Sequence, residues 1–163
     1  MRQENPLRKQ TACFTGHREL PLLQVPRIER QTKDIIRALY AKGVRYFGAG
    51  GAMGFDTLAA ESVLELRDGE CPELRLILIL PCRDQTAHWK RESDLRRYQT
   101  VLSLADKVVY TSEKYYRGCM HHRNRHLVDQ SAYCIAYLTK PTGGTAYTVD
   151  YAQQRGIEVI TIA

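Results

Sequence analysis

GAGGAMGFD, residues 48–56, joins a short apolar run that ends at Gly48 to an amphipathic segment that begins at Phe55. The glycines of this stretch let the backbone turn tightly and let a ligand approach it closely. The first amides of the following helix would point into the same space, where they favour an anion. The stretch therefore predicts a strand, a phosphate-binding loop and a helix in succession.

The same alternation of strand and helix extends in both directions along the chain. Apolar runs of strand length are expected at residues 11–15, 44–48, 74–80, 107–110, 133–138 and 158–162. Amphipathic segments of helix length lie between them, at residues 26–41, 55–67, 87–103, 118–130 and 146–155. We predict an α/β fold: a Rossmann-like, doubly wound and mainly parallel sheet of about six strands with helices on both faces.

The chain of 163 residues has the length of one domain, expected at residues 11–163 behind a flexible N-terminal tail at residues 1–10. Its hydrophobic share of 44% and charged share of 26% are ordinary for a folded domain. The polar start and the short apolar runs predict neither a signal peptide nor a membrane contact. Five scattered cysteines indicate reduced thiols and hence a cytoplasmic protein. The net charge of +6 favours an anionic partner without identifying it.

Ligands of open α/β sheets bind beyond the carboxyl ends of the strands, so the loops that follow the strands form the candidate site. The first of these loops holds Gly16, His17 and Arg18. Glycine permits a turn there, and the basic side chains can meet a phosphate or a carboxylate. A purely structural turn explains the three residues equally well.

The second loop is the opening stretch, in which Gly50, Gly51 and Gly54 are expected to lie against a phosphate. Asp56 would accept a hydrogen bond from a ribose hydroxyl. The alternative is that Asp56 is only an acidic residue favoured by the helix dipole.

The third loop follows residue 80 and carries Gln85 as a polar donor and Trp89 as an aromatic face for a base. A lone tryptophan is also a common core anchor, so a packing role for Trp89 stays open.

The fourth candidate region combines two segments, residues 120–131 (MHHRNRHLVDQS) and residues 142–150 (TGGTAYTVD). A pair of glycines followed by threonine predicts a second amide-rich helix start that suits an anion. The residues expected to bind ligand here are Arg123, Asn124, Gly143, Gly144 and Thr145.

A metal site is not expected in this region. His122 and His126 lie one helical turn apart, a spacing at which two histidines can share a ligand. However, the neighbouring arginines would repel a cation, and no carboxylate or thiol at a suitable spacing completes a ligand set.

Five stretches together resemble the YpsA-like branch of the SLOG superfamily, a Rossmann-like group that includes the DprA DNA-processing proteins and the LOG proteins. The resemblance covers about residues 11–163, and the joint occurrence of the stretches is more specific than any one of them. They are FTGHR at 14–18, GAGGAMGFD at 48–56, LPCRDQTAHW at 80–89, CMHHRNRHLVDQS at 119–131 and GGTAYTV at 143–149.

The resemblance to LOG proteins implies an alternative activity, hydrolysis of the N-glycosidic bond of a nucleoside monophosphate. Met120, His121 and Arg123 match the first part of the LOG motif MHxRK, and Asn124 stands where the lysine would be. Gly144 and Thr145 match the GT of the motif PGGxGTxxE, but Thr148 replaces its glutamate. Because threonine supplies neither charge nor base, no catalytic residue is assigned, and whether the protein is an enzyme stays open.

The resemblance to DprA implies a second alternative, single-stranded nucleic-acid binding, and YpsA-like proteins are associated with cell division, which implies a protein partner. Aromatic residues beside basic ones are few, apart from Tyr115 and Tyr116 next to Lys114 and Arg117. A homo-oligomer is compatible with the sequence. The leading hypothesis is a sensor or regulatory protein that binds a nucleotide or a nucleotide-derived phosphorylated small molecule, with no certain cofactor.

Overall fold

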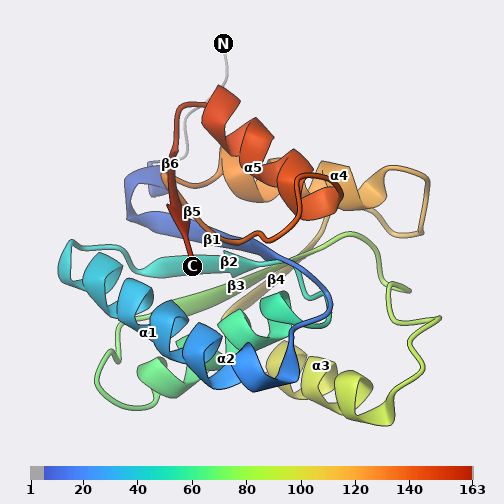
Figure 1. Cartoon of the computed structure of the whole chain (residues 1–163), viewed down its shortest axis with the longest axis horizontal. Coiled ribbons are helices and arrows are strands. Elements are labelled where there is room, and N and C mark those ends of the chain that lie inside the picture. The colour runs from blue at the N-terminus through green and yellow to red at the C-terminus, as the bar shows by residue number, and fades with distance from the viewer. Residues whose placement is uncertain (1–5, 163) are drawn as a thin grey trace.

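The computed structural model describes residues 6–162, and its centre is one six-stranded sheet (Figure 1). The strand order is β4-β3-β2-β1-β5-β6, and every neighbouring pair is parallel. The predicted α/β, Rossmann-like fold is thus confirmed, with a sheet that is parallel throughout. The strands are β1 (Thr11–Gly16), β2 (Tyr46–Ala49), β3 (Arg75–Leu80), β4 (Lys107–Tyr110), β5 (Tyr133–Tyr137) and β6 (Glu158–Thr161).

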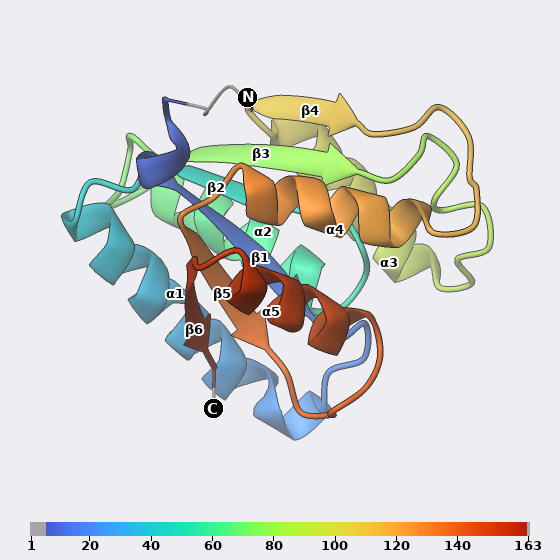
Figure 2. The same cartoon turned by 90° about the horizontal axis from the view of Figure 1, so that it is seen from above.

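Five α-helices connect the strands and cover both faces of the sheet. The first three lie on one face and the last two on the other (Figures 1 and 2). They are α1 (Val25–Ala41), α2 (Phe55–Arg67), α3 (Glu92–Leu104), α4 (Cys119–Asp129) and α5 (Gly144–Gln154). Two short 3-10 helices, η1 (Arg8–Gln10) and η2 (Leu22–Gln24), precede β1 and α1.

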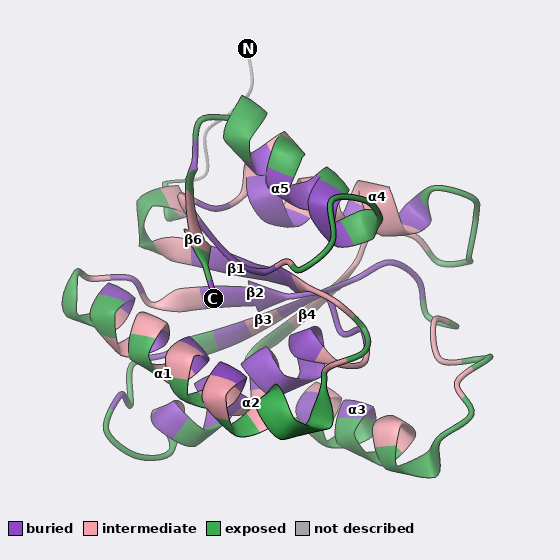
Figure 3. Cartoon of the chain, viewed as in Figure 1, coloured by how far each residue is buried: buried purple, intermediate pink, exposed green. Residues whose placement is uncertain are grey.

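The core lies between the sheet and the helices, where Figure 3 shows buried strand centres and exposed outer helix faces. Helix α1 buries Ile28, Ile36 and Leu39 along one stripe, as its apolar spacing predicts. Phe14 of β1 stacks on Phe47 of β2 at 5.8 Å between ring centroids and meets Phe55 of α2 edge-on at 6.2 Å. These aromatic contacts fix the start of α2 against the strands that carry the candidate site.

The main departure from the predicted boundaries is the start of α3, which begins at Glu92 and not at residue 87. Residues 84–89 form turns, in which the amide of Ala87 donates to Asp84 O and that of Trp89 to Thr86 O. Helix α3 begins only after Arg91, whose backbone is extended, and has Glu92 and Asp94 in its first turn. The helix dipole favours acidic residues in the first turn of a helix. Glu92 and Asp94 therefore indicate the start of α3 better than the apolar spacing does.

The N-terminal segment is described from residue 6 onward, so residues 1–5 of the tail expected at 1–10 lie outside the described part. Arg8 Nε in η1 donates to the carbonyl oxygen of Ser131 at 3.2 Å. None of the helices within residues 6–162 combines the length and the apolar character that a membrane span requires.

The strand order places a crevice at the carboxyl ends of β1 and β5. The chain runs outward from β1 through β2, β3 and β4, and then returns to the other side of β1 with β5. The connections that leave β1 and β5 therefore diverge over opposite faces of the sheet. In doubly wound folds, ligands bind at this kind of topological switch point.

Candidate functional site

A pocket of about 230 Å³ lies at this crevice. Four segments far apart in the sequence enclose it: the end of β1 with its loop, the start of α2, one face of α4 and the first turn of α5. Its lining residues are Thr15, Gly16, His17, Arg18, Ala52, Asp56, Met120, Arg123, Asn124, Gly144 and Thr145.

Helix α5 presents its amide end to this pocket. Gly143 precedes the helix with φ +101°, a left-handed conformation that glycine adopts without strain, and no side chain caps the first turn. That turn contains no acidic residue. Cβ atoms built on Gly143 or Gly144 would meet nothing within 4 Å, so the backbone here faces open space. Uncapped amides at a helix start favour an anion.

Arg18 is an exposed cation at the mouth of the pocket. Its side chain makes no hydrogen bond or ion pair with any other residue in the 6–162 range. It also lines two adjoining hollows, each of about 560 Å³. At the junction of three hollows, a guanidinium that has no partner in the described part of the chain is well placed to meet a ligand phosphate.

Arg123 and Asp56 form the charged inner wall of the pocket, and both are buried. Arg123 Nη1 donates to the carbonyl oxygen of Gly50, and Nε donates to Asn124 Oδ1 at 2.6 Å. Asp56 Oδ2 accepts from the amide of Ala52 at 3.3 Å. The Arg123 side chain is therefore held by the protein, and little of it remains to contact a ligand.

Burial dominates the protonation equilibria of both charged groups. It raises the pKa of the Asp56 carboxyl, and the nearby charge of Arg123 and the Ala52 amide offset part of that rise. It lowers the pKa of the Arg123 guanidinium, and Asp56 opposes this effect. Because an arginine stays protonated in proteins, the Arg123 charge persists behind the pocket.

His17 ties the β1 loop to the β5 loop. Its Nε2 accepts a hydrogen bond from the amide of Thr139 at 2.8 Å, so Nε2 carries no proton. Burial and the charge of Lys140 lower the pKa of His17, which favours this neutral form. The ring also meets Tyr137 edge-on at 5.8 Å. His17 thus positions the pocket wall.

Several of the conspicuous glycines are required by protein packing. A Cβ on Gly16 would lie 2.3 Å from the ring of Phe55, and one on Gly50 would lie 2.6 Å from Arg123 Nη1. Gly54 has φ +76°, and its Cβ would lie 2.2 Å from the carbonyl oxygen of Arg18. These residues bring the loops after β1 and β2 into contact and thereby shape the pocket.

The structure gathers most of the predicted binding residues at one place. Eight of them line the pocket, namely Gly16, His17, Arg18, Asp56, Arg123, Asn124, Gly144 and Thr145. The other six do not line it, namely Gly50, Gly51, Gly54, Gln85, Trp89 and Gly143. Of these, Gly50 and Gly54 support the wall from behind, and Gly143 positions the start of α5.

Gln85 and Trp89 lie outside this pocket because the loop after β3 packs on α3. Trp89 meets Tyr98 of α3 edge-on at 5.3 Å, and Gln85 Nε2 donates to the Tyr98 hydroxyl at 3.4 Å. Trp89 is half-buried and lines one of the adjoining hollows together with Arg18 and Gly54. It combines a packing role with a place beside the candidate site.

Thr148, the residue in place of the LOG glutamate, does not reach the pocket. It is 2% exposed, and its hydroxyl donates to the carbonyl oxygen of Gly144 at 2.9 Å. Asp150 is exposed on the same helix and does not line the pocket either. Asp56 is therefore the one carboxylate among the pocket's lining residues.

Two of the three histidines of α4, His121 and His122, contact aromatic side chains. The His122 Nδ1 and the Tyr116 hydroxyl share a hydrogen bond of 2.7 Å, and the rings of His121 and Tyr147 lie 4.1 Å apart. Over residues 6–162, no three His, Cys, Asp or Glu side chains gather in an arrangement that could hold a metal ion.

Three lining residues were not predicted: Thr15, Ala52 and Met120. Thr15 and Ala52 are adjacent to predicted glycines, and Met120 Sδ accepts a weak hydrogen bond from Arg123 Nη2 at 3.9 Å. Their small or apolar side chains carry no chemical signal of their own. The match to the motif MHxRK could have identified Met120, whereas only their position beside predicted glycines could have identified Thr15 and Ala52.

Comparison with known proteins identifies the family. The family model YpsA, described as the YspA SLOG family, matches residues 13–161. The chain belongs to this family. UPF0398 protein BH1768 from Halalkalibacterium halodurans is 28% identical over 131 residues, which are 78% of this chain and 68% of that protein. UPF0398 protein YpsA from Bacillus subtilis is 25% identical over 131 residues, 78% of this chain and 72% of that protein.

Two solved structures share the fold. DNA processing protein A from Helicobacter pylori, described in a single-stranded DNA binding mode, superposes with a TM-score of 0.67 at 20% identity over 93% of this chain. DprA from Streptococcus pneumoniae superposes with a TM-score of 0.66 at 16% identity over 95% of this chain. This chain spans 64% and 50% of the lengths of those two chains, and at such identities the likeness concerns the fold alone.

Proposed function

We propose that the pocket binds the phosphate group of a nucleotide or a nucleotide-derived small molecule, and that the protein acts as a sensor or regulator of that ligand. The observation that carries the proposal is the meeting in one pocket of the uncapped α5 amides and Arg18, whose side chain has no partner among residues 6–162. Amides at a helix start and a guanidinium are the donors that phosphates prefer. The buried charge of Arg123 adds a positive potential behind them.

The pocket and the hollow that adjoins it are together large enough for a ligand bigger than phosphate. A pocket of about 230 Å³ is smaller than the sites of drug-sized ligands, which occupy about 300–1,000 Å³. The hollow beside Trp89 adds about 560 Å³ and shares Arg18 with the pocket. We propose that the sugar lies near Asp56, which would accept from a hydroxyl, and that the base extends past Arg18 toward Trp89.

Replacing Arg18 with alanine should weaken binding of the nucleotide about tenfold, because a charge-assisted hydrogen bond contributes about 1.5 kcal/mol or more. Native mass spectrometry of the purified protein would first identify any co-purifying nucleotide, and calorimetry with that compound would measure the affinity. Arg30→Ala is the matched control, because Arg30 is an exposed arginine on α1, outside the lining of the pocket. Equal affinity in the Arg18 and Arg30 variants would contradict the proposal.

A second candidate function, single-stranded nucleic-acid binding, is supported by an aromatic and basic loop between β4 and α4. Tyr115 is 62% exposed and Tyr116 is 43% exposed, and Lys114 and Arg117 flank them. Exposed aromatic rings between cations suit the stacking of bases along a strand. The DprA protein from H. pylori, which shares the fold, is described as binding single-stranded DNA.

If this loop binds nucleic acid, the affinity for a labelled oligothymidine should fall linearly with salt on logarithmic axes, as phosphate contacts require. Replacing Tyr115 with alanine should weaken binding by about 1–3 kcal/mol, the cost of one lost stacking contact. Tyr40→Ala, a half-buried tyrosine on α1, is the control for a general loss of stability. Fluorescence anisotropy measures these affinities. An affinity for the oligothymidine that does not change with salt concentration would exclude this function.

A further inference from the structure

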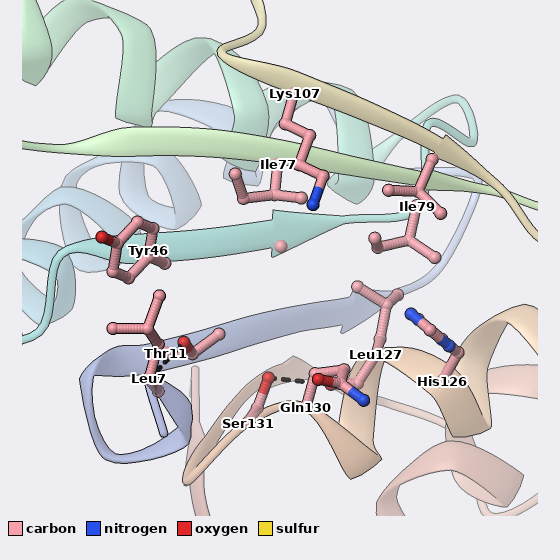
Figure 4. Close-up of a pocket in the computed structure, with 12 residues that line it drawn as sticks. Leu7, Thr11, Tyr46, Ile77, Ile79, Lys107, His126, Leu127, Gln130 and Ser131 are labelled. Carbon is pink, nitrogen blue, oxygen red and sulfur yellow. Dashed lines mark hydrogen bonds between the residues drawn. The ribbon is translucent and has the colours of Figure 1, made fainter. Parts of the chain in front are cut away.

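The face of the sheet that carries α4 and α5 is only partly covered by the protein's own helices. Three helices cover the opposite face, whereas no helix within residues 6–162 lies above β4 and much of β3 on this side (Figure 2). A second pocket, of about 200 Å³, lies here between α4 and strands β2 to β4 (Figure 4). It is lined by a set of residues entirely different from that of the phosphate pocket.

The walls of this second pocket are mainly apolar. Ile77 and Ile79 alternate along β3 and so point to the same face, with Val109 of β4 beside them. Leu127 of α4 closes the opposite side, and Tyr46 of β2 lies at one end (Figure 4). Ile77 and Val109 are half-buried, so part of this surface still meets water. Apolar surface left open next to a pocket is a feature of binding sites.

One cation stands over these apolar walls. The Lys107 side chain reaches from β4 across β3, with its ammonium group beside Ile77 (Figure 4). It makes no ion pair or hydrogen bond with any other residue that the structure describes, and none of the residues that line the pocket is acidic.

The acidic residues on the adjoining elements have partners elsewhere. Asp106 Oδ2 accepts from Arg67 Nη1 and from the amide of Leu76, both at 2.7 Å. Asp129 Oδ1 accepts from the Tyr151 hydroxyl at 2.7 Å. Among residues 6–162, Lys107 therefore has no carboxylate partner, and its charge is available to a ligand.

We propose that this second pocket binds a small amphipathic monocarboxylate, with its hydrocarbon part among Ile77, Val109 and Leu127 and its carboxylate on Lys107. A dry cavity of about 150 Å³ holds a benzene molecule, so this pocket has room for one ring or a short alkyl chain. A second copy of the chain is a poorer occupant. Self-association about this surface would bring two Lys107 side chains together with no carboxylate to pair them.

The test uses octanoate as the charged probe and 1-octanol as its neutral counterpart. Octanoate should shift the methyl resonances of Ile77 and Ile79 in carbon-labelled protein and should bind more tightly than 1-octanol. Lys107→Met keeps the length of the side chain and removes its charge, so it should weaken octanoate about fivefold and leave 1-octanol unchanged. Lys42→Met, at the exposed end of α1, is the matched control.

A blocking variant, Val109→Trp, should fill the pocket and abolish binding of both probes. If this variant does not fold, the comparison of Lys107→Met with Lys42→Met decides alone. The proposal is overturned by equal octanoate affinity in those two variants, or by shifts confined to the amides of Gly144 and Thr145. A dimer in sedimentation that Val109→Trp disrupts would also overturn it, since the occupant would then be a second copy. Phosphate-ligand binding should be unchanged in Lys107→Met, which separates this test from that of the proposed function.

Discussion

Replacing Arg123 with methionine should lower the free energy of unfolding by about 3 kcal/mol, because it removes a buried cation and the hydrogen bonds that this cation donates. The arginine is 4% exposed, and its Nη1 donates to the carbonyl oxygen of Gly50. Methionine preserves most of the apolar contacts but leaves that carbonyl group without its donor. It also removes the larger of the two positive charges that act on the buried Asp56, so that only the exposed Arg18 still offsets its burial. Urea denaturation followed by circular dichroism measures the change.

Arg125→Met is the matched control on the same helix. Arg125 is only half-buried and donates to the Tyr147 hydroxyl at 3.0 Å, so its loss should cost less than about 1 kcal/mol. Adding Asp56→Asn to Arg123→Met should restore part of the lost stability, because the second change removes the charge that the first one left unpaired. Equal losses for Arg123→Met and Arg125→Met would show that the buried site is not the stabilising feature described above.

Replacing Gly54 with alanine should destabilise the protein by about 3 kcal/mol or more, since two penalties combine. The residue has φ +76° and ψ −123°, a conformation that costs any residue with a Cβ. In addition, the new Cβ would lie 2.2 Å from the carbonyl oxygen of Arg18, which is backbone and cannot turn away. The loop that carries Arg18 must therefore move, and nucleotide affinity should fall together with the melting temperature.

Gly156→Ala separates the two penalties. Gly156 has a similar φ of +73°, and a Cβ there would meet nothing within 4 Å, so its replacement tests conformational strain without a collision. We expect a loss of about 1 kcal/mol. If calorimetric melting gave equal losses for the two alanine variants, close packing between the loops at Gly54 and Arg18 would play no part in stability.

The architecture was predictable because its signals are local. The apolar runs that form β1 and β5 and the stripe of Ile28, Ile36 and Leu39 on α1 each follow from spacing within a few residues. The start of α3 was wrong because apolar spacing alone extended the helix backward through Trp89, which instead lies in a turn packed on Tyr98. Tertiary contact overrode the local pattern there.

The candidate site was predictable in outline, because the ends of parallel strands must share an edge of the sheet. The sequence did not reveal which predicted residues support the pocket and which reach its surface. Position 16 requires glycine because the ring of Phe55 packs against it. Position 50 requires glycine because the Arg123 side chain lies against it. Asp56 and Arg123 both line the pocket, but Arg123 is engaged largely with Gly50 and Asn124 behind it. Each of these facts depends on contacts between distant parts of the chain.

Because Arg18 borders three hollows, anions bound in any two of them would compete for its charge. A guanidinium carries a single positive charge, so an anion bound in any one of the hollows would weaken the attraction of Arg18 for an anion in the other two. By thermodynamic reciprocity, each guest then weakens the others to the same degree. One side chain would in this way couple the three hollows without any change in the shape of the protein.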